Sequence, residues 1–257
     1  MIVRPPWAAP AETLFAHETS AAPAEALVSV AVSLHNYARF VPECLGSVAA
    51  QTHGPLDLIV VDDASDADDG AEVAAAWLAA HAGRFARALL LRHRRNQGLA
   101  ETRNTGFAHA RGEAVFVLDA DNVLYPRAIA RLHATMRAEA FDAAYSQLEF
   151  FGAEQRLGYA DIWRRENFAA ENYVDAMALV SRRAWAAVGG YTGFDGGWED
   201  YDFWCKFIDG GMVAAFVPEI LCRYRVHEHS MLRTEHRGRR EDLAVRLTLR
   251  HPWLRIA

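Results

Sequence analysis

Between residues 27 and 152 the sequence alternates short apolar runs with longer amphipathic stretches, and this alternation limits the fold more than any other feature. The apolar runs predict strands over residues 28–34, 56–61, 87–92 and 114–118. The stretches that follow them predict helices over residues 40–51, 71–82, 99–109 and 126–140. Alternation of this kind is typical of βαβ units, and strands that are apolar throughout fit a parallel sheet covered on both faces. We therefore predict an α/β fold with a Rossmann-like, mostly parallel central sheet.

The alternation of apolar runs and amphipathic stretches ends after Gly152, where two irregular segments interrupt shorter elements. One is polar and aromatic (155–173), and the other is rich in glycine and aromatic residues (189–198). Strands are predicted over 143–150, 176–180, 212–217 and 221–226, with one helix over 200–208. Long irregular segments in a compact domain usually serve function. We expect a smaller region of mixed strands whose two long loops take part in ligand selection.

These patterns predict one domain over residues 27–232, built from halves at 27–125 and 126–232. Residues 1–26 contain many Ala and Pro residues and are expected to form a flexible arm. Residues 233–257 are basic, with seven arginines against three acids, and their leucines allow an amphipathic helix. We expect this tail to pack on the domain, while contact with an anionic membrane surface and a link to a further domain stay open.

Composition excludes several classes of protein. A chain of 257 residues that is 52% hydrophobic and 23% charged folds without disulfide or metal staples. Its formal net charge of −6 argues against a nucleic-acid partner. The three cysteines form no Cys-x-x-Cys pair, which fits a reducing cytoplasm, and no apolar run reaches the roughly 18–20 residues of a membrane span. We expect a cytoplasmic protein that contacts at most the inner face of a membrane.

Carboxylates stand at the expected carboxyl ends of two strands, as Asp62-Asp63 and as Asp119 and Asp121. Ligands of open parallel sheets bind beyond these ends. Two carboxylates one residue apart suit a hard divalent cation that keeps positions open for substrate oxygens. Capping of the following helix is the alternative role, and it is weaker for Asp119 and Asp121 because the next helix begins several residues later.

Three common sites are excluded by their motifs. Val123 occupies the fifth position of a would-be EF-hand loop, whose central glycine is also missing. The sequence contains no GxxxxGK[ST] phosphate loop, and the first strand is not followed by GxGxxG. Lys206 is the only lysine, so phosphate contacts made by cationic side chains must come almost wholly from arginine.

Five segments in order carry a family resemblance. They read VSVAVSLHNYARFVPECLGSV, LDLIVVDDAS, NQGLAETRNTGFAHARGEAVFVLDADN, VGGY and GWEDYDFWCKF. Together, over residues 28–231, they resemble a family 2 glycosyltransferase of the GT-A fold. The resemblance implies inverting transfer of a sugar from a nucleoside-diphosphate donor, most often a UDP-sugar, to a hydroxyl of a glycan, a lipid-linked or another acceptor. It also implies Mn²⁺ or Mg²⁺ on the diphosphate and a bacterial role in making cell-envelope polysaccharide.

The resemblance assigns roles to residues at the strand ends. Ser33, His35, Asp63, Arg103 and Asp119 are expected to bind the donor, Asp63 by accepting from the base. Asp121 and His227, with Asp119, are expected to ligate or surround the metal. An aromatic residue is common where His35 stands and Pro or Thr where Ser33 stands, which leaves the nucleotide open. Arg225 or Arg233 is expected on the diphosphate, and His229 is a weaker candidate for metal or phosphate contact.

The acceptor side is expected around the motif Gly197-Trp198-Glu199-Asp200. A sugar hydroxyl is a poor nucleophile, so the reaction needs a base that removes its proton as the new bond forms. Asp200 is predicted to be this base, with Glu199 as the second candidate or as a ligand of acceptor hydroxyls, and Trp198 as a face for a sugar ring. Helix capping is the alternative role for both acids.

Two other functions stay open. A non-catalytic module that binds sugar nucleotides or glycans could share the same fold, although the set of acids is complete. A nucleotidyltransferase also uses paired acids on a related sheet, but it requires a Gly- and Lys/Arg-rich turn after the first strand, where this chain has HNYARF. Both are ranked below transfer of a sugar.

Overall fold

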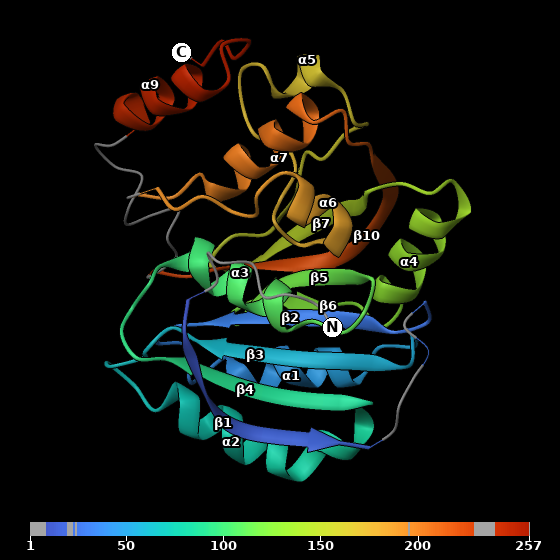
Figure 1. Ribbon diagram of the computed structural model, residues 1–257, viewed down its shortest axis with the longest axis vertical. Helices are drawn as coiled ribbons and strands as arrows, with labels where there is room; N and C mark the ends of the chain where they lie inside the picture. The colour runs from blue at the N-terminus through green and yellow to red at the C-terminus, as the bar shows by residue number, and fades with distance from the viewer. Residues whose placement is uncertain (1–8, 20–22, 24, 195, 229–239, 257) are drawn as a thin grey trace.

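A ten-stranded sheet forms the centre of the computed structural model, which describes residues 9–256 except 20–22, 24, 195 and 229–239 (Figure 1). The strand order is β1-β4-β3-β2-β5-β9-β7-β10-β6, and β8 pairs with β7. The strands are β1 Ala11–Glu18, β2 Val28–Leu34, β3 Leu56–Asp62, β4 Arg87–His93, β5 Ala114–Asp119, β6 Val123–Leu124, β7 Ala143–Gly152, β8 Arg156–Leu157, β9 Ala178–Ser181 and β10 Ala214–Val226.

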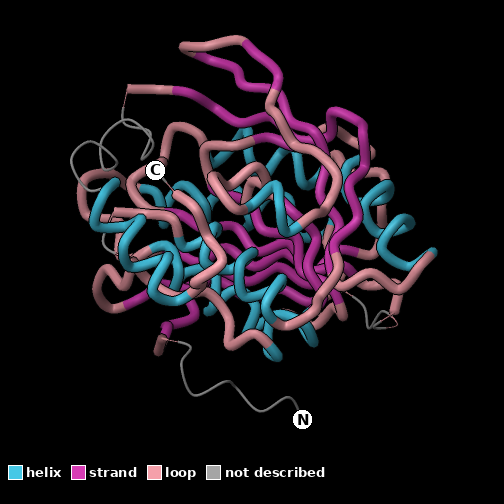
Figure 2. The backbone as a smooth tube through the Cα atoms, turned by 90° about the horizontal axis from the view of Figure 1, so that it is seen from above, coloured by secondary structure: helices cyan, strands magenta, loops and turns pink. Residues whose placement is uncertain are grey.

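Helices cover both faces of this sheet, as Figure 2 shows from above. The α-helices are α1 Val41–Ala49, α2 Gly70–His81, α3 Leu99–His109, α4 Ala128–Ala138, α5 Arg165–Phe168, α6 Arg182–Ala187, α7 Glu199–Asp209 and α9 Arg240–Arg250, with a 3-10 turn, η1, at Ala82–Arg84. Buried residues of α1, α2 and α4 pack on one face, and those of α3, α6, α7 and α9 pack on the other. The predicted α/β class with a mostly parallel sheet is confirmed.

The four strands β4, β3, β2 and β5 pair in parallel and are almost wholly buried, so their carboxyl ends reach one edge of the sheet. The strand β9 then pairs antiparallel with both β5 and β7, while β10 runs parallel to β7. This change of direction produces the predicted mixed region. It also brings the end of β10 beside the turn that follows β5.

The two strands predicted over 212–217 and 221–226 are one strand, β10. Its register against β7 shifts between Val217 and Ile220 and again between Ile220 and Cys222. Pro218 lies in the first shift and has no N–H to donate, so a bulge lets the strand continue past it. The helix α6 was not predicted; Ser181 caps it by accepting from the Ala184 N–H at 3.0 Å.

The predicted flexible arm is wrong for residues 11–18, which form the edge strand β1, antiparallel to β4. Only Ala11 and Phe15 of this strand are partly buried, so its apolar pattern is too weak to identify it from sequence. Backbone pairing with β4 supplies the hydrogen bonds that stabilise it.

The described part of the predicted C-terminal tail packs on the domain. Leu247 of α9 and Leu254 beyond it are buried against the face that carries α7, and Leu243 is buried as well. Arg233 and His229 lie outside the described residues. Among the helices that the structure describes, none combines the length and the apolar character needed to cross a membrane.

Candidate active site

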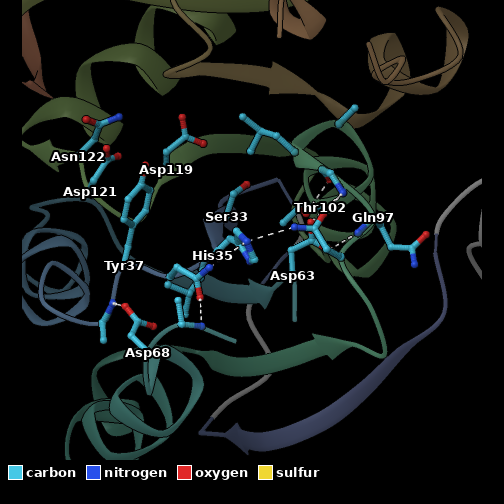
Figure 3. Close-up of a pocket in the computed structure, with 18 of the residues that line it drawn as sticks. Ser33, His35, Tyr37, Asp63, Asp68, Gln97, Thr102, Asp119, Asp121 and Asn122 are labelled. Carbon is cyan, nitrogen blue, oxygen red and sulfur yellow. Dashed lines mark hydrogen bonds between the residues drawn. The ribbon is translucent and has the colours of Figure 1, made fainter. Parts of the chain in front are cut away.

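A cavity of about 1700 Å³ opens at the carboxyl ends of β2, β3 and β5. Figure 3 shows Asp119, Asp121 and Asn122 on one side of it and Asp63 and Gln97 on the other, with Ser33 and His35 between them. The loop before α7 closes the cavity through residues Gly193, Phe194, Gly196, Gly197 and the helix residue Glu199. The cavity therefore joins the predicted donor side to the predicted acceptor side.

Asp63, at the end of β3, organises the loop between β4 and α3. Its Oδ1 accepts from His93 Nδ1 at 2.7 Å and from the Gln97 N–H at 2.8 Å, and its Oδ2 accepts from the Gly98 N–H at 2.8 Å. A carboxylate has about four lone-pair positions, so one acceptor position is left for a ligand. This geometry is compatible with the predicted contact to a base.

His35 and Asn36 together join three loops at the same edge. Its Nε2 lies 3.1 Å from Asn36 Nδ2 and 3.2 Å from Asn96 Nδ2. The Asn36 Oδ1 accepts from the N–H groups of Asp66 and Ala67, which fixes the orientation of that amide. Both neighbours of Nε2 are amide N–H donors, so this arrangement uses Nε2 as a hydrogen-bond acceptor. Ser33 lies two residues earlier, on β2, where it is buried and also lines the cavity.

Arg103 links the two sides of the site. Its buried guanidinium lies 3.1 Å from an Asp119 carboxylate oxygen through Nη2 and 2.8 Å from Glu199 Oε1 through Nη1. Both terminal nitrogens of the guanidinium are thus paired with carboxylates. These negative charges raise the pKa of Arg103, although burial alone would lower it. In this arrangement Arg103 holds Asp119 and Glu199 in place, whereas the sequence predicted a direct contact with the base or diphosphate.

Asp121 and His227 face each other, with 3.1 Å between Oδ2 and Nε2. Burial raises the pKa of Asp121, although the hydrogen bond with His227 acts in the opposite direction. Tyr37 and Phe40 pack against the His227 ring, at 5.4 and 5.0 Å between centroids. The end of β10 therefore supplies an imidazole directly to the turn after β5.

Arg225 holds this turn, in addition to its predicted reach toward a diphosphate. Its N–H donates to Asn122 Oδ1 at 2.9 Å and its Nε donates to the Asp121 carbonyl at 2.8 Å. Its Nη2 lies 2.5 Å from Glu43 Oε2, and the guanidinium stacks on Phe40. The guanidinium is therefore paired already on the side of the site formed by α1.

The chemistry of Asp121 and His227 fits a divalent cation. One carboxylate and one imidazole are ligands that Mn²⁺ accepts, and Asp119 lies two residues away with a quarter of its side chain exposed. Within the described residues, no three His, Cys, Asp or Glu side chains are already gathered as a complete metal cage. The remaining positions of a bound cation would fall to water and to ligand oxygens.

The acceptor-side acids begin α7 after a tight turn. Gly196, Gly197 and Trp198 all have positive φ angles, of 102°, 97° and 68°. This conformation is easy for glycine and uncommon for tryptophan, so the turn fixes where the helix starts. The Trp198 ring packs on Tyr201, at 5.8 Å between centroids. The predicted sugar-stacking face is therefore also part of the helix packing.

Glu199 and Asp200 have different environments. Glu199 lines the cavity and is paired with Arg103, whereas Asp200 accepts from Asn172 Nδ2 at 2.9 Å and from the Tyr201 N–H at 2.8 Å. Burial, with the adjacent Glu199 charge, raises the pKa of Asp200 to about 7. A carboxylate with this pKa and neutral partners is better suited to take a proton near neutral pH than one paired with arginine.

Sequence reasoning missed two residues of this region. Asp175 accepts from the Met177 N–H at 2.8 Å, and burial raises its pKa to about 6, with Asp119 and Asp121 adding to the effect. Asn172 belongs to the predicted ligand-selecting segment but carried no motif. The only signal for Asp175 was an acid directly before a short apolar strand, a pattern that also describes an ordinary loop.

Comparison with known proteins gives the family. The model of Glycosyl transferase family 2 matches residues 29–186. The O-antigen biosynthesis protein RfbC of Myxococcus xanthus is 31% identical over 176 residues, which are 66% of this chain and 14% of that protein. Other curated relatives are also longer, since the chain spans about a third of their length.

Two solved structures share the fold. TarS 1-349 of S. aureus in complex with UDP-GlcNAc superimposes with a TM-score of 0.71 at 14% identity, covering 86% of this chain and 65% of that one. The mannosyltransferase PcManGT of Pyrobaculum calidifontis, in complex with GDP-Man and Mn2+, gives a TM-score of 0.61 at 20% identity, covering 80% and 58%. The predicted GT-A fold is confirmed, and the chain belongs to glycosyl transferase family 2.

Proposed function

We propose that this chain transfers a sugar, with inversion, from a UDP-sugar to an acceptor hydroxyl. The observation that carries the proposal is a cavity lined by Asp63, Asp121 and Glu199 together, with Arg103 bridging its two sides. Family membership supports transfer chemistry, and UDP-GlcNAc in the complex of TarS supports a UDP-sugar. The acceptor class we propose is a glycan or lipid-linked hydroxyl of a bacterial envelope, in keeping with the name of the Myxococcus relative.

Different residues of the chain bind the donor and take the acceptor proton in an in-line displacement. The base edge of the donor meets Asp63 and His35, and its diphosphate extends toward Asp121 and His227. Asp200 takes the acceptor proton as the new bond forms at the anomeric carbon and the bond to the diphosphate breaks, so the configuration inverts. When bound, Mn²⁺ or Mg²⁺ would neutralise charge on the leaving diphosphate.

Binding of the sugar nucleotide tests the proposal first. At about 100 times the dissociation constant, a ligand adds about 2.7 kcal/mol to the free energy of unfolding. For a domain of this size we expect UDP with Mn²⁺ to raise the melting temperature by roughly 5 °C or more. Thermal-shift assays over UDP-, GDP- and dTDP-sugars, with Mn²⁺ or with EDTA, measure this.

The same assay separates the alternatives. Stabilisation together with release of UDP from a UDP-sugar supports a transferase. Stabilisation without release, in the presence of candidate acceptors, would indicate a binding module on the same fold. A preference for nucleoside triphosphates would indicate a nucleotidyltransferase, and no stabilisation by any nucleotide contradicts the proposal.

The pH dependence of kcat/KM tests the role of Asp200. The ionised carboxylate is the active form, and burial with the Glu199 charge raises the pKa of Asp200 to about 7. We therefore expect activity to rise with pH through about 7. Glu199→Gln removes the neighbouring negative charge, so the acid limb of the profile should move to lower pH even as the maximal rate falls. A limb that stays in place in this variant contradicts the assignment.

A further inference from the structure

A buried carboxylate outside the cavity gathers an arginine, a lysine and an imidazole. Asp202 of α7 has no exposed surface, and its Oδ1 lies 2.7 Å from Arg250 Nε and 3.1 Å from His251 Nε2. Lys206, the only lysine of the chain, approaches Oδ2 at 3.4 Å. Burial alone would raise the pKa of Asp202, but the hydrogen bonds from His251 and Arg250 outweigh it and lower the pKa to about 2.

The lysine and the arginine also hold the loop that forms a wall of the cavity. Lys206 Nζ donates to the Gly190 carbonyl and to Thr192 Oγ1, the latter at 3.0 Å. Arg250 Nη2 donates to Thr192 Oγ1 at 3.3 Å, and its guanidinium lies 5.7 Å from the centre of the Phe194 ring. Phe194 lines the cavity. Asp202 is thus connected to the cavity wall through two side chains.

The C-terminal segment, residues 240–256, is fixed to the domain at further points. Its helix α9 lies beside α7 in Figure 1, and His251 Nδ1 lies 2.5 Å from Asp209 Oδ2 at the other end of α7. Trp253 Nε1 donates to Asp209 Oδ1 at 2.8 Å, and the Arg255 N–H donates to the Ala169 carbonyl at 2.6 Å. The segment therefore spans from α7 to the acceptor-side loop that contains Ala169.

A loop with five glycines between residues 189 and 197 has much conformational entropy to lose when it is held in one shape. Charge-assisted hydrogen bonds to buried groups are strong enough to offset such a loss. The described residues on either side, Glu199 and Tyr191, already contact Arg103 and Asn104. The middle of the loop is anchored through Thr192.

We propose that Asp202, together with Lys206 and Arg250, is a positioning unit that fixes the cavity wall formed by residues 190–194 and 196–197, so that the C-terminal segment is a working part of the transfer site. The matched family model ends at residue 186, before α7, so this unit lies beyond the matched region. The proposal rests on the proposed function for its effect on turnover. The anchoring of the loop does not depend on the proposed function.

Hydrogen exchange in Arg250→Met tests the anchoring. The variant keeps an apolar stem but loses the bonds to Asp202 and Thr192, so we expect amides of residues 190–194 and 196–197 to exchange about tenfold faster. Thr192→Val removes only the hydroxyl shared by Lys206 and Arg250, and it tests the same loop if Arg250→Met does not fold. Arg246→Met is the matched control, because Arg246 lies one turn earlier on α9 and pairs with exposed Asp242. Loop exchange equal to the wild type in the variants overturns the proposal.

Turnover of the sugar nucleotide selected by the thermal screen tests the positioning role. We expect Arg250→Met to lower kcat about tenfold while the dissociation constant for UDP, measured by calorimetry, stays within about twofold. Arg250→Lys, which keeps the charge beside Asp202, should recover part of the rate, and Arg246→Met should behave as the wild type. Faster loop exchange with an unchanged kcat contradicts positioning. A wild-type chain that turns over no sugar nucleotide contradicts the proposed function, whereas hydrogen exchange still decides whether the loop is anchored.

Discussion

Replacing Asp200 by asparagine is expected to lower the kcat of sugar transfer by about 10²–10⁴-fold, the usual contribution of a positioned general base. Asparagine has the same shape, and its carbonyl oxygen can still accept from the Tyr201 N–H, which lies 2.8 Å from Asp200 Oδ1. Because Asp200 is hydrogen-bonded to Asn172 and Tyr201 and not to Asp63 or His35, the affinity for UDP should stay within about twofold. Rapid-quench or coupled assays of UDP release, with calorimetry of UDP binding, measure both quantities.

The variant should remain folded, and the sign of the expected stability change follows from the pKa. Burial and the Glu199 charge raise the pKa of Asp200 from 3.8 to about 7 in the folded state. Between these pH values the folded state binds more protons than the unfolded state, so this residue makes the free energy of unfolding fall as pH rises. At pH 8 the neutral asparagine avoids that loss, while its NH2 group, placed opposite Asn172 Nδ2, gives up one hydrogen bond, so the melting temperature should change little.

Glu199→Gln separates the two candidate bases. Glu199 is paired with Arg103 at 2.8 Å, so the variant releases one side of the arginine that also holds Asp119. We expect a smaller loss of kcat than in Asp200→Asn, combined with the acid shift of the pH profile. Full turnover by Asp200→Asn, or a profile in which only Glu199→Gln loses the acid limb, would falsify the assignment of Asp200.

The sequence was sufficient for the parallel half of the sheet and for the residues at its strand ends. Residues 28–34 and 99–109 were predicted to be a strand and a helix and are β2 and α3 with the same bounds. Apolar runs that end at Asp62 and Asp119 predicted where β3 and β5 end, although Asp62 itself is buried and is paired with Ser65 and Arg92. The order of the motifs then placed both acids at one edge.

The partners of the charged residues could not be predicted in the same way. Arg103 is surrounded by residues far apart in the chain, since Glu199 lies 96 positions away, and its pairing depends on how α7 packs. The strand β1 depends on the free edge of β4, and Lys206 gained its role only because Asp202 and Thr192 meet it in space. Local patterns encode elements, whereas these roles arise from tertiary contacts.

Asp121→Asn is expected to remove most of the effect of Mn²⁺ on nucleotide binding. Asp121 is buried beside His227, and burial raises its pKa because it disfavours the charged carboxylate. A bound cation would stabilise that charge, so the site gains from a positive ion. Asparagine keeps one neutral oxygen but loses the charge, so we expect the affinity for UDP in the presence of Mn²⁺ to fall by about 10–100-fold. Calorimetry with Mn²⁺ and with EDTA measures the change.

Comparing the affinity for UDP with Mn²⁺ and with EDTA tests whether Asp121 holds a metal. With EDTA present, Asp121→Asn and the wild type should bind UDP equally, because Asp63 and the loops it holds are untouched. Asp119→Asn is the companion variant: it removes the carboxylate of the same turn that is paired with Arg103, so its loss should lower kcat as well as the gain from Mn²⁺. Asp121→Asn that keeps the wild-type gain from Mn²⁺ contradicts a metal held by Asp121. An equal loss in EDTA contradicts it as well, because Asp121 would then serve the nucleotide pocket without a cation.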